Sequence, residues 1–280
     1  MKKLLTRTLV GIVYVAVMVA GTVIRPWGLL LLVLLLTALA VREFIHIVSA
    51  GCGLRVNRSV LACSSLAFPL ATYFACTLPE INALLLFTPW LVSLLFFFVF
   101  ELGQSNPNHI GNLGLMSMTQ LYVVLPLSLL LVLALGPVSA QLAGEPFWLF
   151  PLATYIFLWL DDSGAYIFGS LLGKHKLSPK ISPGKTWEGA IGGAVLTVAA
   201  AVVMWRLFPF MGVWNWIGLG LVVVVFGTFG DLTESLIKRQ LDLKDSGNLL
   251  PGHGGILDRI DSMLLAVPAV VAYLALCGIA

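Results

Sequence analysis

Long apolar runs separated by short polar connections make up most of this chain. The first run follows Lys2, Lys3 and Arg7 and continues to about Ile24. Each run is close to the ~20 residues that a helix needs to cross a bilayer, and none alternates as a barrel strand does. The pattern predicts an all-α, polytopic membrane protein with about nine spans. After the first, these spans are expected near 27–48, 59–78, 82–100, 116–136, 147–170, 189–208, 213–230 and 263–279.

The composition agrees with a membrane protein. Hydrophobic residues make up 59% of the 280 residues and charged residues only 10%, which is outside the range of a soluble domain and leaves no room for a separate one. The formal net charge of +3 is modest and does not indicate a nucleic-acid partner. The first run is expected to be a membrane helix rather than a signal peptide, because it continues directly into a second span without a convincing cleavage site. The four cysteines show neither CxxC nor metal-ligand spacing, so we interpret them as small membrane-core residues.

The positive charges predict an orientation. With the amino terminus in the cytoplasm, fourteen of the sixteen Lys and Arg residues fall on or near the cytoplasmic side, and only Arg25 and Arg206 fall outside. We therefore expect a protein of the cell membrane with a cytoplasmic amino terminus and an external carboxyl terminus. Both long polar connections, 161–188 and 231–261, then lie on one face, so a polar site is expected at the cytoplasmic face.

Acidic residues are concentrated in and between those two connections. Nine of the thirteen lie between Asp161 and Asp261. Asp161 and Asp162 directly follow the apolar YIFLWL, and a carboxylate at the bilayer centre costs about 2.5–3.5 kcal/mol. They are either helix-end carboxylates in the headgroup region or side chains that line a polar cavity, and the sequence leaves both open.

The first connection contains the basic stretch GKHKLSPKISPGKTWEG, residues 173–189. Its GKT is not a P-loop, because Pro179 stands where that motif needs a glycine and the flanking segments are membrane helices. A helix is expected to start near Trp187, where Lys185 and free backbone amides can meet an anion. Lys174 and Lys176 are better explained by topology or by contact with anionic headgroups.

The second connection combines carboxylates, cations and glycines. Asp231, Glu234 and Lys238 recur at helical spacing and share a face, and Glu234 with Lys238 fits an ordinary i,i+4 pair. A glycine turn, PGHGG at 251–255, follows, and Asp258 then begins the last helix. Hard carboxylate oxygens suit Mg²⁺, while Lys and Arg suit phosphoryl oxygens. The inventory indicates a site for a divalent metal and phosphate.

These residues resemble the signature S-x-x-K-R-x4-K-D-x5-P-G-H-G-G-x-x-D-R-x-D of the phosphatidate cytidylyltransferases (CDP-diacylglycerol synthases), matched from Ser235 to Asp261. The stretch SPGKTWEG at 182–189 resembles a second, weaker element of that family, S-P-x-K-T-x-E-G. Up to about residue 145 the resemblance is only architectural. We therefore expect amino-terminal transmembrane helices over 1–145 and a transmembrane catalytic region over 146–280, with the signature at 235–261.

The resemblance implies the Mg²⁺-dependent reaction of CTP with phosphatidate to give CDP-diacylglycerol and pyrophosphate. The residues support the same chemistry, because a lipid phosphate monoester, with its second pKa at about 6, is mostly ionised at neutral pH and needs little help from a base. In-line attack on the α-phosphorus mainly requires positioning and cations on the leaving pyrophosphate. The site is expected to be a cavity open both to the cytoplasm, for CTP, and sideways to the inner leaflet, for the lipid.

Roles for individual residues follow as hypotheses. The proposed metal ligands are Asp231, Asp258 and Asp261, and the family resemblance points to the first two. The proposed catalytic residues are Asp258, Asp261, Lys238 and Lys244. The residues expected to bind substrate are Lys185, Ser182, Ser235, Arg239, His253, Gly254 and Arg259, and which cation serves which phosphate stays open. Asp161 and Asp162 are candidates to line the same cavity, and Asp245 is a candidate partner of Lys244 or Arg259.

Two other functional classes are compatible with parts of the pattern. A transporter also places charges in broken helices at membrane depth, but it does not require both polar connections on one face, and no repeated half is visible. A related lipid or polyprenol nucleotidyl- or phosphotransferase is closer. The sequence leaves CTP or dCTP open, and a homodimer is suggested only by family analogy.

Overall fold

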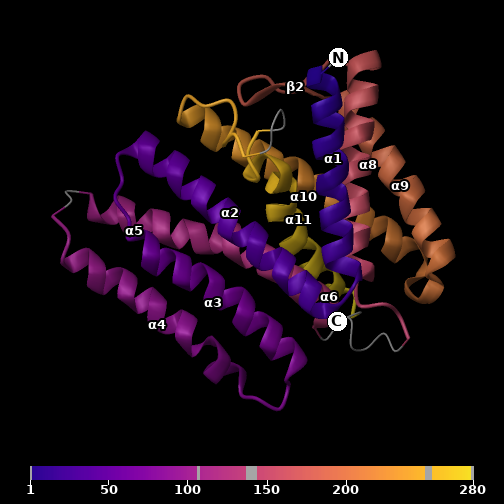
Figure 1. Ribbon diagram of the computed structural model, residues 1–280. Coiled ribbons are helices and arrows are strands. Elements are labelled where there is room, and N and C mark those ends of the chain that lie inside the picture. Colours follow the sequence, from indigo (N-terminus) through magenta and orange to yellow (C-terminus); the bar gives the residue numbers. More distant parts are fainter. Residues whose placement is uncertain (1, 106–107, 137–143, 250–253, 279–280) are drawn as a thin grey trace. The chain divides into compact units, whose positions relative to one another are not determined.

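The computed structural model describes residues 2–105, 108–136, 144–249 and 254–278 (Figure 1). In these residues helices predominate, and they are α1 (Lys2–Val23), α2 (Pro26–Cys52), α3 (Arg58–Thr77), α4 (Ala83–Leu102), α5 (His109–Met118), α6 (Leu125–Leu135), α8 (Leu149–Leu172), α9 (Trp187–Leu207), α10 (Gly212–Gln240) and α11 (Leu257–Leu276). A π-helical stretch, η1 (Thr119–Val124), joins α5 to α6, and a short 3₁₀ turn, η2 (Pro209–Met211), precedes α10. A small antiparallel hairpin pairs β1 (Lys176–Ser178) with β2 (Ser182–Thr186).

The prediction of an all-α, polytopic membrane protein is confirmed. Each of the nine expected spans overlaps a helical segment of the described chain. Seven of those segments are long and apolar enough to cross a membrane, and they are Pro26–Cys52, Arg58–Thr77, Ala83–Leu102, His109–Leu135, Trp187–Leu207, Pro209–Gln240 and Leu257–Leu276. Of the remaining two, α1 contributes a shorter apolar stretch, Thr8–Val23. Helix α8 is continuous, but Asp161 and Asp162 interrupt its apolar run.

The helices extend further into the polar connections than the sequence predicted. Helix α8 continues to Leu172 and α10 to Gln240, so only 173–186 and 241–256 lie outside the flanking helices. A helix can leave the apolar region without ending because its backbone hydrogen bonds stay within the segment. Asp161 and Asp162 are consequently in the middle of α8, and their interpretation as helix-end carboxylates is wrong.

The chain forms two compact units. The first consists of Met1–Pro137 with Leu241–Ile260, and the second of Val138–Gln240 with Asp261–Ala280. In the first unit α2 packs against α1, α3 and α6, and α3 also packs against α4. In the second unit α9 packs extensively against α8 and also against α10. The signature segment thus contributes to both units, because its middle part belongs to the first and its two ends to the second.

Local sequence explains the tight connection between α2 and α3. Helix α2 starts with Pro26, and Gly53 caps its carboxyl end. The φ of Gly53, 65°, is in the left-handed region that glycine adopts without strain. Asn57 then caps α3, because its side chain accepts the amide hydrogens of Ser59 and Val60. The short connection makes these two helices neighbours around a core that includes Phe44.

Glycines allow α8 and α9 to approach closely in the second unit. A Cβ atom on Gly164 would lie 2.8 Å from the Cα of Gly193, which is closer than real Cβ atoms come to other atoms. Small residues serve the same purpose in many membrane helix pairs. The contact fixes the part of α8 that carries Asp161, whose carboxylate lies against Gly193.

Candidate functional site

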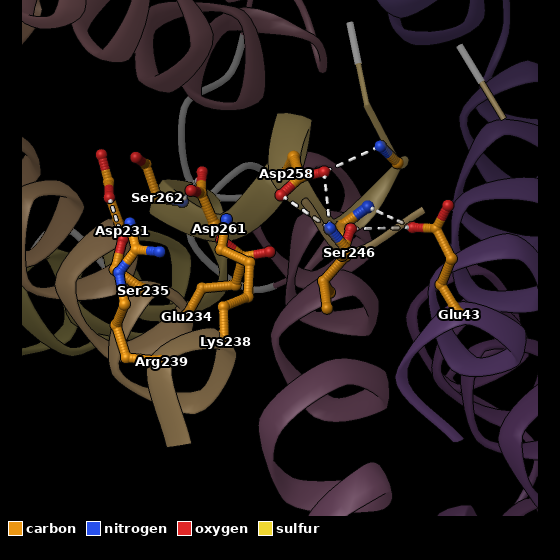
Figure 2. Close-up of polar contacts among 12 residues, drawn as sticks. Glu43, Asp231, Glu234, Ser235, Lys238, Arg239, Ser246, Asp258, Asp261 and Ser262 are labelled. Carbon is orange, nitrogen blue, oxygen red and sulfur yellow. Dashed lines mark hydrogen bonds and ion pairs between the residues drawn. The ribbon is translucent and has the colours of Figure 1, made fainter. Parts of the chain in front are cut away.

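The last three turns of α10 carry a group of polar side chains (Figure 2). Asp231 forms an ion pair of 2.8 Å between its Oδ2 and the Nζ of Lys185, which comes from β2. Its other oxygen, Oδ1, accepts a hydrogen bond of 3.1 Å from the hydroxyl of Ser235. The side chains of Lys185 and Asp231 are 26% and 27% exposed. Solvent therefore reaches this pair, and its energetic contribution is small, on the order of 1 kcal/mol or less.

Glu234 and Lys238 form a second ion pair one turn further along α10. The i,i+4 pair expected from the sequence is present, and it is largely buried, because the Glu234 side chain is only 1% exposed and that of Lys238 only 12%. Removing one partner of a buried pair leaves an uncompensated charge, which is costly. The pair consequently holds an ammonium group inside the structure.

Asp261 on α11 adds another carboxylate to this group. Its Oδ1 accepts the amide hydrogen of Ser262 at 2.7 Å, and it interacts electrostatically with the carboxylates of Asp231, Glu234 and Asp162. Gly230 makes the approach possible, since a Cβ there would lie 2.9 Å from the Cα of Ser262. Several like charges are thus gathered beside two lysines, an arrangement that a cation would stabilise.

Asp161 is the most deeply buried carboxylate on α8. The residue is 5% exposed, and its Oδ1 has no hydrogen-bond partner among the described residues. A buried acceptor left unpaired costs about 1–3 kcal/mol, so this oxygen is suited to receive a cation or a polar ligand atom. Across the described ranges, however, no three His, Cys, Asp or Glu side chains are arranged as a complete metal site.

The hairpin before α9 is tied down by Thr186 and Glu188. The Thr186 hydroxyl accepts the amide hydrogen of Gly189 at 3.2 Å, so it caps α9. Glu188 accepts the amide hydrogens of Lys174 and His175 and lies 2.6 Å from Nδ1 of His175. These contacts fix the strand that presents Lys185, and α9 begins at Trp187 as predicted.

In the first unit, Asp258 binds backbone amides of the signature segment. Its carboxylate accepts the amide hydrogen of Ser246 at 3.0 Å and that of Gly255 at 2.7 Å (Figure 2). Glu43 of α2 accepts the hydroxyl hydrogen of Ser246 at 3.3 Å and the amide hydrogen of Leu257 at 2.9 Å. The two carboxylates together hold Ser246, Gly255 and Leu257 near α2.

Glycines are required where this segment turns. Gly254 has a φ of 81°, which agrees with the tight turn expected from the sequence. A Cβ on Gly255 would lie 2.6 Å from Oε1 of Glu43, so a larger residue has no room there. The preceding residues of the turn, including His253, lie outside the described residues.

Comparison with known proteins identifies the family. The family model described as "Cytidylyltransferase family" matches residues 5–277. The chain belongs to the cytidylyltransferase family. It is 49% identical over 118 residues to a phosphatidate cytidylyltransferase of Staphylococcus aureus (strain COL), and the match covers 42% of this chain and 45% of that relative. Proteins of the same name from Staphylococcus haemolyticus (strain JCSC1435) and Staphylococcus saprophyticus are 48% identical over the same length and share of each chain. The aligned stretch thus spans less than half the length of these curated relatives.

The structure distributes the expected site residues over four places. Helix α10 carries Asp231, Ser235, Lys238 and Arg239, β2 carries Ser182 and Lys185, α11 carries Asp258, Arg259 and Asp261, and the segment between α10 and α11 carries Lys244 and Gly254. Arg239 donates from Nε to the carbonyl oxygen of Ile181 at 3.4 Å, which connects α10 to the hairpin. Lys244, Asp245 and Arg259 are exposed, and within the described ranges no ion pair joins Asp245 to either cation.

The contacts of Glu43, Ser246 and Tyr14 with the signature segment were not predicted from the sequence. The hydroxyl of Tyr14 donates to the backbone carbonyl oxygen of Arg259 at 3.1 Å. Only Glu43 gave a usable signal, because a carboxylate inside an apolar run requires a partner. Its partners are more than 200 residues away, so the sequence did not reveal them.

Proposed function

We propose that this protein is a phosphatidate cytidylyltransferase that converts CTP and phosphatidate to CDP-diacylglycerol and pyrophosphate for phospholipid biosynthesis. Family membership, the printed name of the relatives and the signature at 235–261 support the proposal. The observation that carries it is the group formed by Lys185, Asp231, Glu234, Lys238 and Asp261, which combines carboxylates with ammonium groups in a membrane protein. Such a combination suits phosphates and their counter-ion.

Mg²⁺ is the proposed cofactor, and Asp231, Asp258 and Asp261 are its proposed ligands. Two observations support a cation here. The carboxylate of Asp261 is close to those of Asp231 and Glu234, and Oδ1 of Asp161 has no hydrogen-bond partner among the described residues. Asp258 already accepts two backbone amide hydrogens, yet a carboxylate offers about four lone-pair sites and retains capacity for a cation. When bound, Mg²⁺ neutralises phosphate charge and favours departure of pyrophosphate.

The remaining residues would bind and orient the two substrates. A phosphate oxygen of the lipid forms a bond to the α-phosphorus of CTP while the bond from that phosphorus to the bridging oxygen breaks, and pyrophosphate leaves with the electron pair. Lys238 and Lys244 are proposed to stabilise the charge that develops, with Lys185, Arg239 and Arg259 on the phosphates. Hydroxyl groups of Ser182 and Ser235, and the turn at His253 and Gly254, are proposed to bind phosphate oxygens. A general base is unnecessary because the lipid phosphate is already ionised.

The location and assembly of the enzyme are proposals as well. The distribution of Lys and Arg supports an amino terminus in the cytoplasm and a carboxyl terminus outside, which gives CTP access to both polar connections. A cavity open to the cytoplasm and to the inner leaflet would admit the nucleotide and the lipid. dCTP is a second candidate nucleotide, and a homodimer is proposed by family analogy.

Purified protein in detergent tests this proposal directly. We expect labelled CTP and phosphatidate to give CDP-diacylglycerol and one equivalent of pyrophosphate, and EDTA to abolish the reaction until Mg²⁺ is restored. Polyprenyl phosphate and diacylglycerol serve as alternative acceptors, and dCTP as an alternative nucleotide. Transfer to polyprenyl phosphate alone, or accumulation of a solute in vesicles without pyrophosphate release, would overturn the assignment.

A further inference from the structure

A cavity of about 580 Å³ lies within the first unit. Its walls come from α2, α3 and residues 246–249. Seven of the fifteen lining residues are aliphatic, among them Leu39, Ile45 and Leu66, and the basic residues Arg42, His46 and Arg58 also contribute. The volume is in the range of sites that bind small molecules, about 300–1,000 Å³. An apolar cavity with basic residues is suited to an anionic amphiphile.

Helical spacing explains how the cavity forms. Ala38 and Arg42 are one turn apart on α2, and Arg58 and Ala62 are one turn apart on α3, so each pair lies on one face of its helix. The alanines are small, and both are exposed rather than filled by a neighbouring side chain. Space between the two helices therefore remains open beside the arginines.

The basic and apolar residues are ordered along both helices. Arg42 is sixteen positions after Pro26, about 24 Å along α2 at 1.5 Å per residue, which is most of the thickness of a bilayer core of about 30 Å. Arg58 is the first residue of α3. Ala38 and Leu39 precede Arg42, and Ala62 and Leu66 follow Arg58, so these four aliphatic residues lie on the bilayer side of the arginines, while Ile45 lies beyond Arg42. A glycerophospholipid has the same order of charged headgroup and acyl chain.

The positive charge of the arginines is not matched by an ion pair. Both side chains are exposed, and none of the ion pairs of the described residues involves Arg42 or Arg58. Glu43 also lines the cavity, but its Oε2 already accepts hydrogens from Ser246 and Leu257. The two guanidinium groups therefore outweigh the single carboxylate of Glu43, and the charged residues of the lining are net positive.

We propose that this cavity binds an intact anionic glycerophospholipid of the bilayer that differs from the lipid consumed in the proposed reaction. The headgroup phosphate lies beside Arg42 and Arg58, and an acyl chain follows Ala38, Leu39 and Ala62. The third wall, 246–249, begins with Ser246, whose amide and hydroxyl are bound by Asp258 and Glu43. A lipid in the cavity therefore supports the same segment that these carboxylates hold.

Lipid binding to the purified full-length protein tests the inference without CTP or Mg²⁺. In native mass spectrometry, we expect phosphatidylglycerol to bind at least about tenfold more tightly than phosphatidylcholine, the difference that one charge-assisted hydrogen bond supplies. Replacing both arginines (Arg42→Gln with Arg58→Gln) is expected to remove this preference. Arg55→Gln is the matched control, because Arg55 is exposed, near Arg58 and not part of the cavity lining.

Two further variants keep the result interpretable. Ala62→Trp fills the apolar part and is expected to reduce binding of phosphatidylglycerol, while the conservative pair Arg42→Lys with Arg58→Lys retains most of it. Glycerol phosphate should compete only weakly, because it lacks the acyl chain. Equal binding of the two lipids, an equal loss in Arg55→Gln, or full displacement by glycerol phosphate would overturn the proposal.

The outcome is independent of the proposed enzymatic function. Phosphatidylglycerol carries a phosphodiester and not the phosphomonoester that the proposed reaction consumes. Lys185→Met is expected to bind phosphatidylglycerol as the wild type does while turning over more slowly. If phosphatidate binds but phosphatidylglycerol does not, the cavity is a site for the lipid monoester and the inference fails, whereas absence of turnover leaves it intact.

Discussion

Carboxylates have different kinds of partner in the two units. In the first, Asp258 and Glu43 accept hydrogens from Ser246, Gly255 and Leu257, all of which are neutral donors. In the second, Asp231 and Glu234 are paired with the ammonium groups of Lys185 and Lys238. The first arrangement fixes a segment of chain, because backbone amides cannot change partners without moving the backbone. The second leaves charged groups that can exchange partners through side-chain motion alone.

This contrast predicts a division of roles between the carboxylates of the first unit and those of the second. Among the carboxylates bound by neutral donors, Glu43 is outside the proposed metal site and should govern stability when it is changed, whereas Asp258 is also a proposed metal ligand. Carboxylates crowded by like charges and paired with lysines should govern binding and turnover. Four substitutions test this division, and their expected effects decrease in the order given.

Asp261→Asn should have the largest effect and should act on turnover. Removal of one of several crowded carboxylates weakens the proposed Mg²⁺ site, and we expect a loss of at least about 100-fold in kcat, comparable to removal of a group that stabilises transition-state charge. CDP-lipid formation measures this effect, and thermal unfolding in detergent should change little. Glu80→Gln, at an exposed acid outside the group, is the control. Full activity in Asp261→Asn would end the metal-ligand assignment for this residue.

Glu43→Ala should show the opposite pattern and lower stability. It leaves the hydroxyl of Ser246 and the amide of Leu257 without their acceptor, and a buried donor without a partner costs about 1–3 kcal/mol. The melting temperature in detergent should fall accordingly. Glu43→Gln retains an acceptor oxygen and should fall less. An unchanged melting temperature in both variants would show that Glu43 does not hold the signature segment.

Lys185→Met tests the exchange of partners by a lysine. If the ammonium group moves between Asp231 and a substrate phosphate, its loss should raise KM for CTP or for phosphatidate by about tenfold, the value of one charge-assisted hydrogen bond. Lys185→Arg should restore part of the affinity. The substrate whose KM changes identifies the phosphate that Lys185 contacts, and no change in either would restrict Lys185 to a structural role.

Thr186→Ala should have the smallest effect. The substitution removes the side-chain cap of α9, and loss of a cap typically costs about 1 kcal/mol. We expect a small decrease in melting temperature and a modest change in turnover, because β2 ends at this residue. Thr186→Ser keeps the hydroxyl and should behave as the wild type. A larger loss of turnover than Lys185→Met produces would indicate that the hydroxyl itself contacts substrate.

Much of the fold was predictable because membrane spans are a local property of sequence. A run of about 20 apolar residues must be helical in lipid to satisfy its own backbone, and each of the nine expected ranges overlaps a helical segment of the described residues. The start of α9 at Trp187 was predictable for a similar reason, since Thr186 supplies a cap within the same few residues. The polar connections were less predictable, because α8 and α10 extend into them.

The site was predictable in its residues but not in its pairings. The sequence by itself showed that carboxylates, lysines and a glycine turn lie between Asp161 and Asp261. Because charges without partners are costly in lipid, this concentration predicted a functional site there. Only the tertiary structure decided that Lys185 pairs with Asp231, that Asp161 is buried against Gly193, and that Glu43 of α2 holds Ser246. The physical reason is that a pairing between distant residues depends on how whole helices pack, and the same charged residue can satisfy its need with any of several partners until packing selects one.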